Sequence, residues 1–436
     1  MTFANAYSWS IPKRLKLQAE KIIAEEQAGF KAGRSTTEQI FNLRILCEKY
    51  LQHQQDLYHN LIDFKKAFDK VWHAALWATM KKYNISTNLI QVIKNLYNKA
   101  SSAVLFNGAK GDWFRTTVGV WQGCLLSPTL FNIFLERIMA HVLEDHEGTV
   151  SIGGRTIANL RFADDIDGLA VEEEEVASLV ERLDKASTAY GLEISAEKTK
   201  LITNNTSGIN TDQSQWTEAS DSHKLQVPGL SYKWWGFRIA QATAALTRLK
   251  PVCIDKNISL SSKIRLMHSL VTSIFLYAYE SWTHTAELQR RIQAMEMRCY
   301  RKILRISYKG HVTNEEVRAK IQQAIGPHED LLTIVKRCKL QWYGHVSRSS
   351  GVAKTILQGT VKGGRRQGGQ WKRWEWTGLE FGKSQWAVEN REKWRKVVAK
   401  SSVVPQRPSP LEEWWWWGEG FWVCTGANLV KVSSIA

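Results

Sequence analysis

The sequence lacks the features that would place the protein in a membrane or outside the cell. No uninterrupted apolar stretch reaches the roughly 20 residues that a membrane-spanning helix needs. The N-terminal segment, MTFANAYSWSIPKRLK, lacks the order of basic and then apolar residues that marks a secretory signal peptide. We therefore expect a protein with no membrane partner that is not secreted and works inside the cell, in the nucleus, the cytoplasm or both.

Cysteine is sparse and shows no pattern. The six cysteines form no CxxC motif and no close pair with histidine: Cys47, Cys124, Cys253, Cys299, Cys338 and Cys424. This spacing predicts neither a zinc site nor a disulfide framework, and it suits a reducing compartment.

Acidic residues are outnumbered by basic ones, and this imbalance indicates a class of partner. The 436-residue chain has 59 lysines and arginines against 42 aspartates and glutamates, a formal net charge of +17. An excess of this size attracts a polyanion, and nucleic acid is the first candidate. The hydrophobic content of 44% is ordinary for a globular protein, and the length allows two or three domains. Charge alone indicates a partner but no reaction.

Two adjacent acids lie among apolar residues in the segment 160–170, LRFADDIDGLA. The pattern predicts a β-hairpin with one strand through Phe162, a tight turn carrying Asp164 and Asp165, and a return strand from Ile166. Neighbouring carboxylates repel each other and lose hydration, so a cation is expected beside them, and oxygen ligands suit Mg²⁺ or Mn²⁺. Taken alone, the pair is better explained as a solvated, aspartate-rich turn.

A third acid ends a predicted strand earlier in the chain. Residues 57–63 are expected to form a strand that ends at Asp63, where a carboxylate is well placed to face a ligand. Asp69 is the competing acid, but its position beyond the strand suggests a helix start or a solvent-facing role. Three acids from two β elements are what a two-metal phosphoryl-transfer site needs, because two divalent ions activate a 3′-hydroxyl and neutralise the leaving pyrophosphate.

Two glycine-containing loops offer further contacts to a ligand. Glycines flank Lys31 and would bring it together with Arg34 as a phosphate-contacting pair, although a solvated basic loop explains these residues equally well. A second loop at 119–123 contains Gln122 and Gly123 and would let backbone approach a flat ligand closely.

Hydrophobic periodicity predicts helices and short hairpins in alternation, an α+β pattern. The expected elements are a helix capped by Ser35, helices at 72–83 and 87–99, a hairpin at 102–118 turning at Asn107 and Gly108, a helix capped by Ser127, a hairpin around Gly153 and Gly154, and a helix from Glu172 to Gly191. Beyond a loop-like stretch at about 203–230, the pattern at 240–345 is helical.

Five sequence runs occur in a fixed order across roughly residues 20–205: EEQAGFKAGRSTTEQIF, LIDFKKAFDKVWH, GVWQGCLLSPTLFNIF, FADD and GLEISAEKTKL. Together they resemble the reverse transcriptase domain of non-LTR (LINE-type) retrotransposons. Any single run would be a weak signal, but five in the order and spacing of the family are hard to obtain otherwise. The resemblance implies an RNA-directed DNA polymerase that uses an RNA template, a DNA primer, deoxynucleoside triphosphates and two Mg²⁺ or Mn²⁺ ions.

By this resemblance, the catalytic centre consists of three acids and one lysine. Asp63, Asp164 and Asp165 correspond to the metal-binding acids of the palm. Lys198 matches a lysine proposed to assist the leaving pyrophosphate, and a structural salt bridge is the alternative role.

The resemblance also implies contacts to nucleotide and template. Phe68 matches the aromatic residue that excludes a ribose 2′-hydroxyl and so favours deoxynucleotides. Gln122 and Gly123 match the loop that packs on the template and the incoming nucleotide. Lys31 and Arg34 match basic residues of the fingers near the triphosphate.

The fold implied is α+β, a right-hand polymerase built on an antiparallel palm sheet with helices. We expect partial fingers at 1–55, the palm at 56–205, an irregular linker with a degenerate primer grip at 206–240, a helical thumb-like region at 241–350, and a basic, tryptophan-rich and partly disordered tail at 351–436.

Several departures from the family pattern suggest a truncated and partly decayed copy. Trp121 stands where relatives usually have a basic residue, and 232–236 is only a vestige of the primer grip. No endonuclease domain precedes residue 1, and the chain contains 20 tryptophans, several where arginine is expected. A catalytically inactive remnant that binds RNA or DNA through its basic surface is therefore the alternative to an active polymerase.

Overall fold

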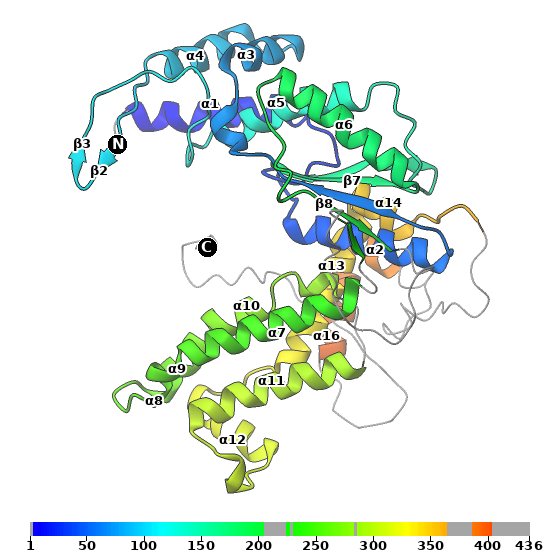
Figure 1. The fold of residues 1–436 in the computed structure, drawn as a ribbon. Coiled ribbons are helices and arrows are strands. Elements are labelled where there is room, and N and C mark those ends of the chain that lie inside the picture. Colours follow the sequence, from blue (N-terminus) through cyan, green and yellow to red (C-terminus); the bar gives the residue numbers. More distant parts are fainter. Residues whose placement is uncertain (1–2, 205–223, 227–229, 283–285, 364–385, 403–436) are drawn as a thin grey trace. The chain divides into compact units, whose positions relative to one another are not determined.

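The computed structural model describes most of the chain, and the described residues form two units. They are residues 3–204, 224–226, 230–282, 286–363 and 386–402 (Figure 1). The sheet unit comprises residues 1–228 and 358–366, and the helical unit comprises 229–357 and 367–436. No helix in the described part of the chain is long and apolar enough to cross a membrane.

A five-stranded sheet forms the centre of the sheet unit, in the order β6-β7-β1-β8-β9. Its strands are β1 (Tyr58–Ile62), β6 (Asn159–Phe162), β7 (Asp165–Ala170), β8 (Lys200–Thr203) and β9 (Lys224–Gln226). Strand β1 pairs antiparallel with both β7 and β8, so it lies in the middle of the sheet. The four strands β6, β7, β1 and β8 pair antiparallel as expected, and β9 adds to this sheet by running parallel to β8. The connection between the two strands is long enough for a parallel pairing, which a tight turn would not allow.

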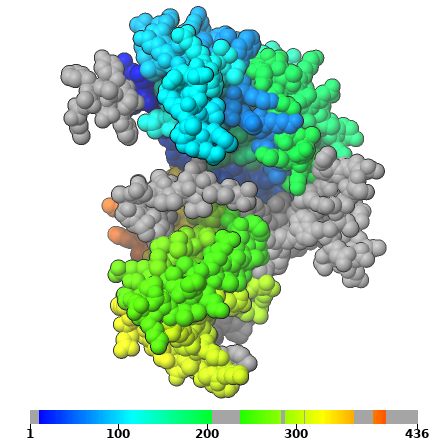
Figure 2. Space-filling view, turned by 60° about the vertical axis from the view of Figure 1, so that its left-hand side comes forward, coloured from blue at the N-terminus to red at the C-terminus, as the bar shows by residue number. Residues whose placement is uncertain are grey.

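Helices cover the sheet, and the unit also contains short β-hairpins. The elements are α1 (Phe3–Ala19), α2 (Thr36–Gln52), the 3₁₀ turn η1 (Ala67–Lys70), α3 (His73–Lys82), α4 (Thr87–Asn98), β2 (Leu105–Phe106), β3 (Ala109–Lys110), α5 (Ser127–Val142), β4 (Ser151–Ile152), β5 (Arg155–Thr156) and α6 (Glu173–Ala189). Helices α5 and α6 lie above the sheet in Figure 1 and α2 lies below it. The chain segment that carries β2 and β3, cyan in Figure 2, forms part of the surface, and Leu105 and Phe106 are 73% exposed.

The core of the sheet unit is built around α5. Its predicted apolar face is fully buried, with Leu130, Phe131, Phe134, Leu135 and Ile138 all at 0% exposure. This packing fixes α5 against α3 and α6. The helix therefore provides a rigid support for the segments that carry the acids.

Two predicted helix starts have different outcomes. Ser35 caps α2 as expected, since its hydroxyl accepts a hydrogen bond from the backbone N–H of Glu38 at 3.3 Å. The cap of α5 is Leu126, so the prediction of Ser127 as the cap is wrong by one residue. The shift places Pro128 at the second helical position, where its missing N–H costs no intrahelical hydrogen bond.

The helical unit contains the second hydrophobic core. Its helices are α7 (Leu230–Arg248), α8 (Lys250–Ile254), α9 (Leu260–Met267), α10 (Ser273–Phe275), α11 (Ala286–Leu304), α12 (Asn314–Ile325), α13 (Leu331–Arg348), α14 (Val352–Gln358) and α16 (Arg391–Ser402). A π-helical segment, η2 (His268–Thr272), joins α9 to α10, and the short 3₁₀ turns η3 (Tyr279–Ser281) and η4 (Tyr308–Gly310) flank α11.

The structure differs from the expected linker at 206–240. Helix α7 begins at Leu230, so the last third of that range is helical. The stretch follows Pro228 and contains a single glycine, Gly236, so little in it opposes a helix. The vestigial primer grip at 232–236 therefore lies within a helix. Most of the tail expected at 351–436 lies outside the described residues, as do the tryptophans at 414–417.

Candidate active site

The three predicted acids lie at the same end of the sheet. Ile62, the last residue of β1, pairs with Ile166 of β7, so the next residues, Asp63 and Asp165, lie across from each other. Asp164 lies beside them in the two-residue turn that joins β6 to β7. The predicted hairpin is therefore confirmed, with Asp165 as the first residue of the return strand and not part of the turn.

The three carboxylates influence one another electrostatically. Burial is the main cause that raises the pKa of Asp165, to about 6, and the charges of Asp164 and Asp63 raise it further. Burial also raises the pKa of Asp164, with a smaller contribution from Asp63. Carboxylates that resist ionisation in this way would be stabilised in their charged form by a nearby cation.

Lys198 provides a cation beside these acids. Its Nζ lies 2.7 Å from Oδ2 of Asp63, and the ion pair raises the pKa of the lysine. The backbone positions the lysine, because the N–H of Ser195 donates to the Asp63 carbonyl at 2.8 Å and the N–H of Lys198 donates to the Ser195 carbonyl at 3.2 Å. The salt bridge expected as an alternative role for Lys198 is thus present, and the lysine stands beside the acids.

The donor set has the chemistry that a hard divalent ion requires. Carboxylate oxygens are the preferred ligands of Mg²⁺ and Mn²⁺, and here they come from two adjoining β elements. In the described residues, however, no group of three or more His, Cys, Asp or Glu side chains is assembled closely enough to hold a metal ion. The expected ready-made ligand cluster is therefore not formed, because uncompensated carboxylates repel one another and Asp63 pairs with Lys198.

The predicted nucleotide contacts Phe68 and Gln122 lie on two segments that are hydrogen-bonded to each other. The ring of Phe68 stacks on Phe131 of α5, with 4.5 Å between centroids. Its carbonyl accepts a hydrogen bond of 2.8 Å from the N–H of Val120, which brings the 119–123 loop alongside. The side-chain amide of Gln122 donates a hydrogen bond to Oδ1 of Asp69 at 3.2 Å. Asp69, which the sequence offered as the alternative to Asp63, therefore holds the loop.

Gly123 completes this loop in a conformation that favours glycine. Its φ is +84°, and no described atom lies within 4 Å of where a Cβ would stand. The loop is therefore open to an approaching ligand at this point, as the sequence predicted for backbone contact.

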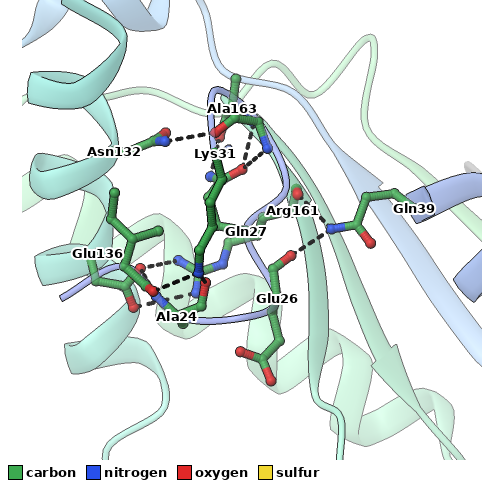
Figure 3. Close-up of polar contacts among 11 residues, drawn as sticks. Ala24, Glu26, Gln27, Lys31, Gln39, Asn132, Glu136, Arg161 and Ala163 are labelled. Carbon is green, nitrogen blue, oxygen red and sulfur yellow. Dashed lines mark hydrogen bonds and ion pairs between the residues drawn. The ribbon is translucent and has the colours of Figure 1, made fainter. Parts of the chain in front are cut away.

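The predicted phosphate pair, Lys31 and Arg34, is engaged within the chain. Lys31 Nζ donates to the carbonyls of Ile23 and Ala24, each at 3.0 Å (Figure 3). Burial and, to a lesser extent, the charge of Arg34 lower the pKa of this lysine. Arg34 forms an ion pair with Glu38 of α2. Both cations therefore form contacts within the chain and are not presented together to a ligand.

Comparison with known proteins identifies the family. The family model described as "Reverse transcriptase (RNA-dependent DNA polymerase)" matches residues 4–239, more than half of the chain. The chain belongs to the reverse transcriptase family.

Relatives of the chain include proteins of non-LTR retrotransposons. The chain is 30% identical to the R2 retrotransposon polyprotein of Nasonia vitripennis over 142 residues, which cover 33% of this chain and 14% of that one. It is 26% identical to a transposon-derived protein of Caenorhabditis elegans over 243 residues, 52% of this chain and 80% of the relative. It is 25% identical to the RNA-directed DNA polymerase of the jockey element of Drosophila melanogaster over 189 residues, 42% and 20% of the two chains. The match thus spans a small part of the R2 and jockey proteins.

Among solved structures, telomerase of Candida tropicalis shows a remote likeness to this chain. The TM-score is 0.38 at 13% identity, over 81% of this chain and 62% of that one. A likeness at this level adds nothing to the family assignment.

Trp121, at the position where the resemblance led us to expect a basic residue, is part of an aromatic cluster. Trp121 stacks on Tyr97 with 4.3 Å between centroids and 12° between planes. Tyr97 in turn contacts the rings of His73 and Trp77 edge-on. Trp121 therefore stabilises the loop by packing, which a basic residue would do less well.

Five residues that the sequence analysis did not single out connect the N-terminal loop to the hairpin. They are polar, partly or fully buried and linked by hydrogen bonds: Gln27, Gln39, Asn132, Glu136 and Arg161 (Figure 3). Their partners lie as many as 136 residues away in sequence, so no local pattern indicates the contacts. The one available signal is that Gln27 falls inside the family-like run EEQAGF, which the analysis used only for its cations.

Proposed function

We propose that the chain is the RNA-directed DNA polymerase of a non-LTR retrotransposon and acts inside the cell. It would copy an RNA template by adding deoxynucleotides to the 3′-hydroxyl of a DNA primer. The observation that carries the proposal is the register of β1 and β7, which sets Asp63 across from Asp165, with Asp164 in the adjoining turn. Membership of the reverse transcriptase family supports the same reaction.

The reaction is a nucleotidyl transfer. The primer 3′-oxygen bonds to the α-phosphorus of the incoming triphosphate, the bond from that phosphorus to the bridging oxygen breaks, and pyrophosphate leaves. Two divalent ions, when bound, would favour loss of the hydroxyl proton and neutralise the phosphate charge. Asp63, Asp164 and Asp165 are the residues that would hold them.

Lys198 is suited to act on the leaving group. Its raised pKa keeps the ammonium protonated at neutral pH, and its side chain is 70% exposed beside Asp63. An exposed ammonium at this edge can neutralise the departing pyrophosphate and give it a proton.

Phe68 and the 119–123 loop would select and seat the nucleotide. Phe68 is held between two rings, stacked on Phe131 and edge-on to Phe30 at 6.2 Å. A ring with so little freedom can exclude a 2′-hydroxyl by steric conflict. Gln122 and Gly123 would pack on the template and the incoming base, while the net charge of +17 holds the nucleic acid.

An inactive remnant that binds RNA or DNA through its charge is the second candidate. It is supported by the engagement of Lys31 and Arg34 within the loop, which removes two expected triphosphate contacts. The ion pair of Lys198 with Asp63 supports it as well, because the ammonium occupies a carboxylate oxygen that would otherwise bind a metal ion.

A primer-extension assay separates the two functions. The full chain is mixed with an RNA template annealed to a DNA primer, deoxynucleoside triphosphates and Mg²⁺, and an Asp164→Asn variant serves as the control. Extension by the wild type that is lost in Asp164→Asn, with equal binding of the duplex by both, supports the polymerase. Equal binding with no extension by the wild type supports the remnant.

A further inference from the structure

The turn that carries Asp164 has an unusual backbone. Ala163, the first residue of the turn, has a φ of +58°, a left-handed conformation that residues other than glycine rarely adopt. Such a conformation persists only where its surroundings hold it in place. Because Asp164 follows directly, whatever holds the peptide of Ala163 also directs the carboxylate of Asp164.

The side chain of Gln27 forms hydrogen bonds with both backbone polar groups of Ala163, the N–H and the carbonyl. Oε1 of Gln27 accepts the N–H of Ala163 at 2.9 Å, and Nε2 of Gln27 donates to the Ala163 carbonyl at 3.1 Å. The same Oε1 also accepts the N–H of Gly29 at 2.8 Å. Gln27 is 1% exposed, so these bonds do not compete with water (Figure 3).

The loop that carries Gln27 is itself fixed at several points. It lies along the edge of β6, with the N–H of Ala28 donating to the Arg161 carbonyl and the N–H of Arg161 donating to the Glu26 carbonyl, each at 2.9 Å. Asn132 of α5 donates to the Gly29 carbonyl at 2.8 Å. The position of the glutamine amide is therefore set by the core of the sheet unit before any ligand arrives.

The geometry points to Gln27 as a positioning residue that orients Asp164 for binding a divalent cation. The inference rests on the proposed function, since it assumes that Asp164 is a metal ligand. Residues that orient a metal ligand contribute to affinity without touching the ion, and their loss typically weakens binding by about 10–100-fold. Gln27 makes no contact with the acids themselves and acts only through the peptide of Ala163.

The test compares Gln27 with Gln39, two glutamines that hold the same loop. Gln27→Met keeps the side-chain volume and removes all three hydrogen bonds. Gln39→Met is the matched control, because Gln39 donates to the carbonyls of Glu26 and Arg161 at 2.6 and 2.8 Å and holds the same loop without touching Ala163. Mn²⁺ binding to the full chain without nucleic acid is followed by the electron paramagnetic resonance of the free ion, and Asp164→Asn defines the site.

We expect Gln27→Met to raise the Mn²⁺ dissociation constant about tenfold or more, while Gln39→Met leaves it near the wild-type value. The half-saturating Mg²⁺ in primer extension should rise in parallel, with the KM for the nucleotide less affected. If Gln27→Met does not fold, Gln27→Glu serves in its place, because it retains the two acceptor contacts and replaces the donation to the Ala163 carbonyl by a carboxylate oxygen that repels this carbonyl. It should weaken Mn²⁺ binding to a smaller degree.

Four outcomes would contradict the inference, the function or both. Equal Mn²⁺ affinity in the wild type and the Gln27 variant, or equal losses in the Gln27 and Gln39 variants, would overturn the positioning role. A wild type that binds Mn²⁺ through Asp164 but extends no primer would contradict the polymerase alone, and the Gln27 comparison would still hold. A wild type with no Asp164-dependent binding would overturn both.

Discussion

Lys198 places its ammonium 2.7 Å from Oδ2 of Asp63, at the end of the sheet where Asp164 and Asp165 also lie. Its charge compensates an acid that would otherwise face two other carboxylates. The lysine therefore has two effects that oppose each other: it stabilises the acids without a metal ion, and it competes with a metal ion for Asp63.

Replacing Lys198 should separate these effects. In Lys198→Met we expect the half-saturating Mg²⁺ in primer extension to fall severalfold, because the ammonium no longer competes for Asp63. The rate at saturating Mg²⁺ should fall as well, because the leaving pyrophosphate loses its proton donor. Lys200→Met, which removes an exposed charge from β8, is the control for net charge and should change neither value. An increased Mg²⁺ requirement in Lys198→Met would contradict the competition.

Gly29 should tolerate no side chain. A Cβ at this position would lie 2.1 Å from the backbone nitrogen of Ala163, so Gly29→Ala must push the hairpin turn away. We expect the free energy of unfolding to fall by about 1–3 kcal/mol or more and primer extension to be lost with it. Gly168→Ala in β7 is the control, with no described atom within 4 Å of the added carbon, and should change stability by less than about 0.5 kcal/mol. Urea denaturation gives both values, and equal losses would contradict the close contact.

Removing one partner of the buried ion pair between Arg161 and Glu136 should strongly lower the free energy of unfolding. Arg161 is 2% exposed, and its Nη1 lies 3.2 Å from Oε2 of Glu136. Arg161→Met leaves the glutamate without its counter-charge and should cost about 3–5 kcal/mol of unfolding free energy. Adding Glu136→Gln to that variant should recover part of the loss.

Arg155 provides the control for this pair. It forms ion pairs with Glu25 and Glu26 at 2.6 and 2.8 Å, but its side chain is 34% exposed. Arg155→Met should therefore cost less than about 1 kcal/mol. If the losses in Arg155→Met and Arg161→Met were the same in urea denaturation, burial would not be the factor that gives the Arg161 pair its importance.

The helical unit should lose stability as the pH rises towards neutrality. Burial is the main cause that raises the pKa of Glu296 in α11 from 4.5 to about 7. Between these values the unfolded chain releases a proton that the folded unit retains, so stability falls from about pH 4.5 to pH 7 and is constant above. The loss from this one group is on the order of 3 kcal/mol.

Thermal melting at pH 5 and pH 8 measures this loss. Glu296→Gln, which is neutral at both values, should reduce the difference in melting temperature of the helical unit. Glu280, whose pKa burial also raises to about 7, would account for the remaining slope. The exposed Glu315 of α12 serves as the control, and Glu315→Gln should keep the wild-type slope. A Glu296→Gln protein with an unchanged slope would contradict the assignment.

The sequence predicted the elements that depend on local patterns. The first strand of the hairpin around Asp164 has alternating apolar residues, and periodicity alone indicated the buried face of α5. The register that sets Asp63 across from Asp165 was not predictable in this way, since it depends on pairing between strands about 100 residues apart.

The sequence did not predict where polar side chains point in the folded protein, and this was the main limit of prediction from the sequence. Lys31 and Arg34 had the composition of a phosphate site, but the loop folds back so that their charges meet Glu38 and backbone carbonyls. The local pattern did not indicate the contacts of Gln27, because its partner lies 136 residues away and glutamine is common on surfaces. Contacts of this kind depend on the tertiary fold.

Iron-mediated cleavage tests the central claim most directly, namely that Asp63, Asp164 and Asp165 share divalent cations. Fe²⁺ takes the place of Mg²⁺, and ascorbate with peroxide generates hydroxyl radicals that cut the backbone next to the bound ion. The account predicts fragments that end near residue 63 and near residues 163–165, both suppressed by excess Mg²⁺ and by Asp164→Asn. Cleavage at only one of these segments, or at both but unchanged in Asp164→Asn, would contradict it.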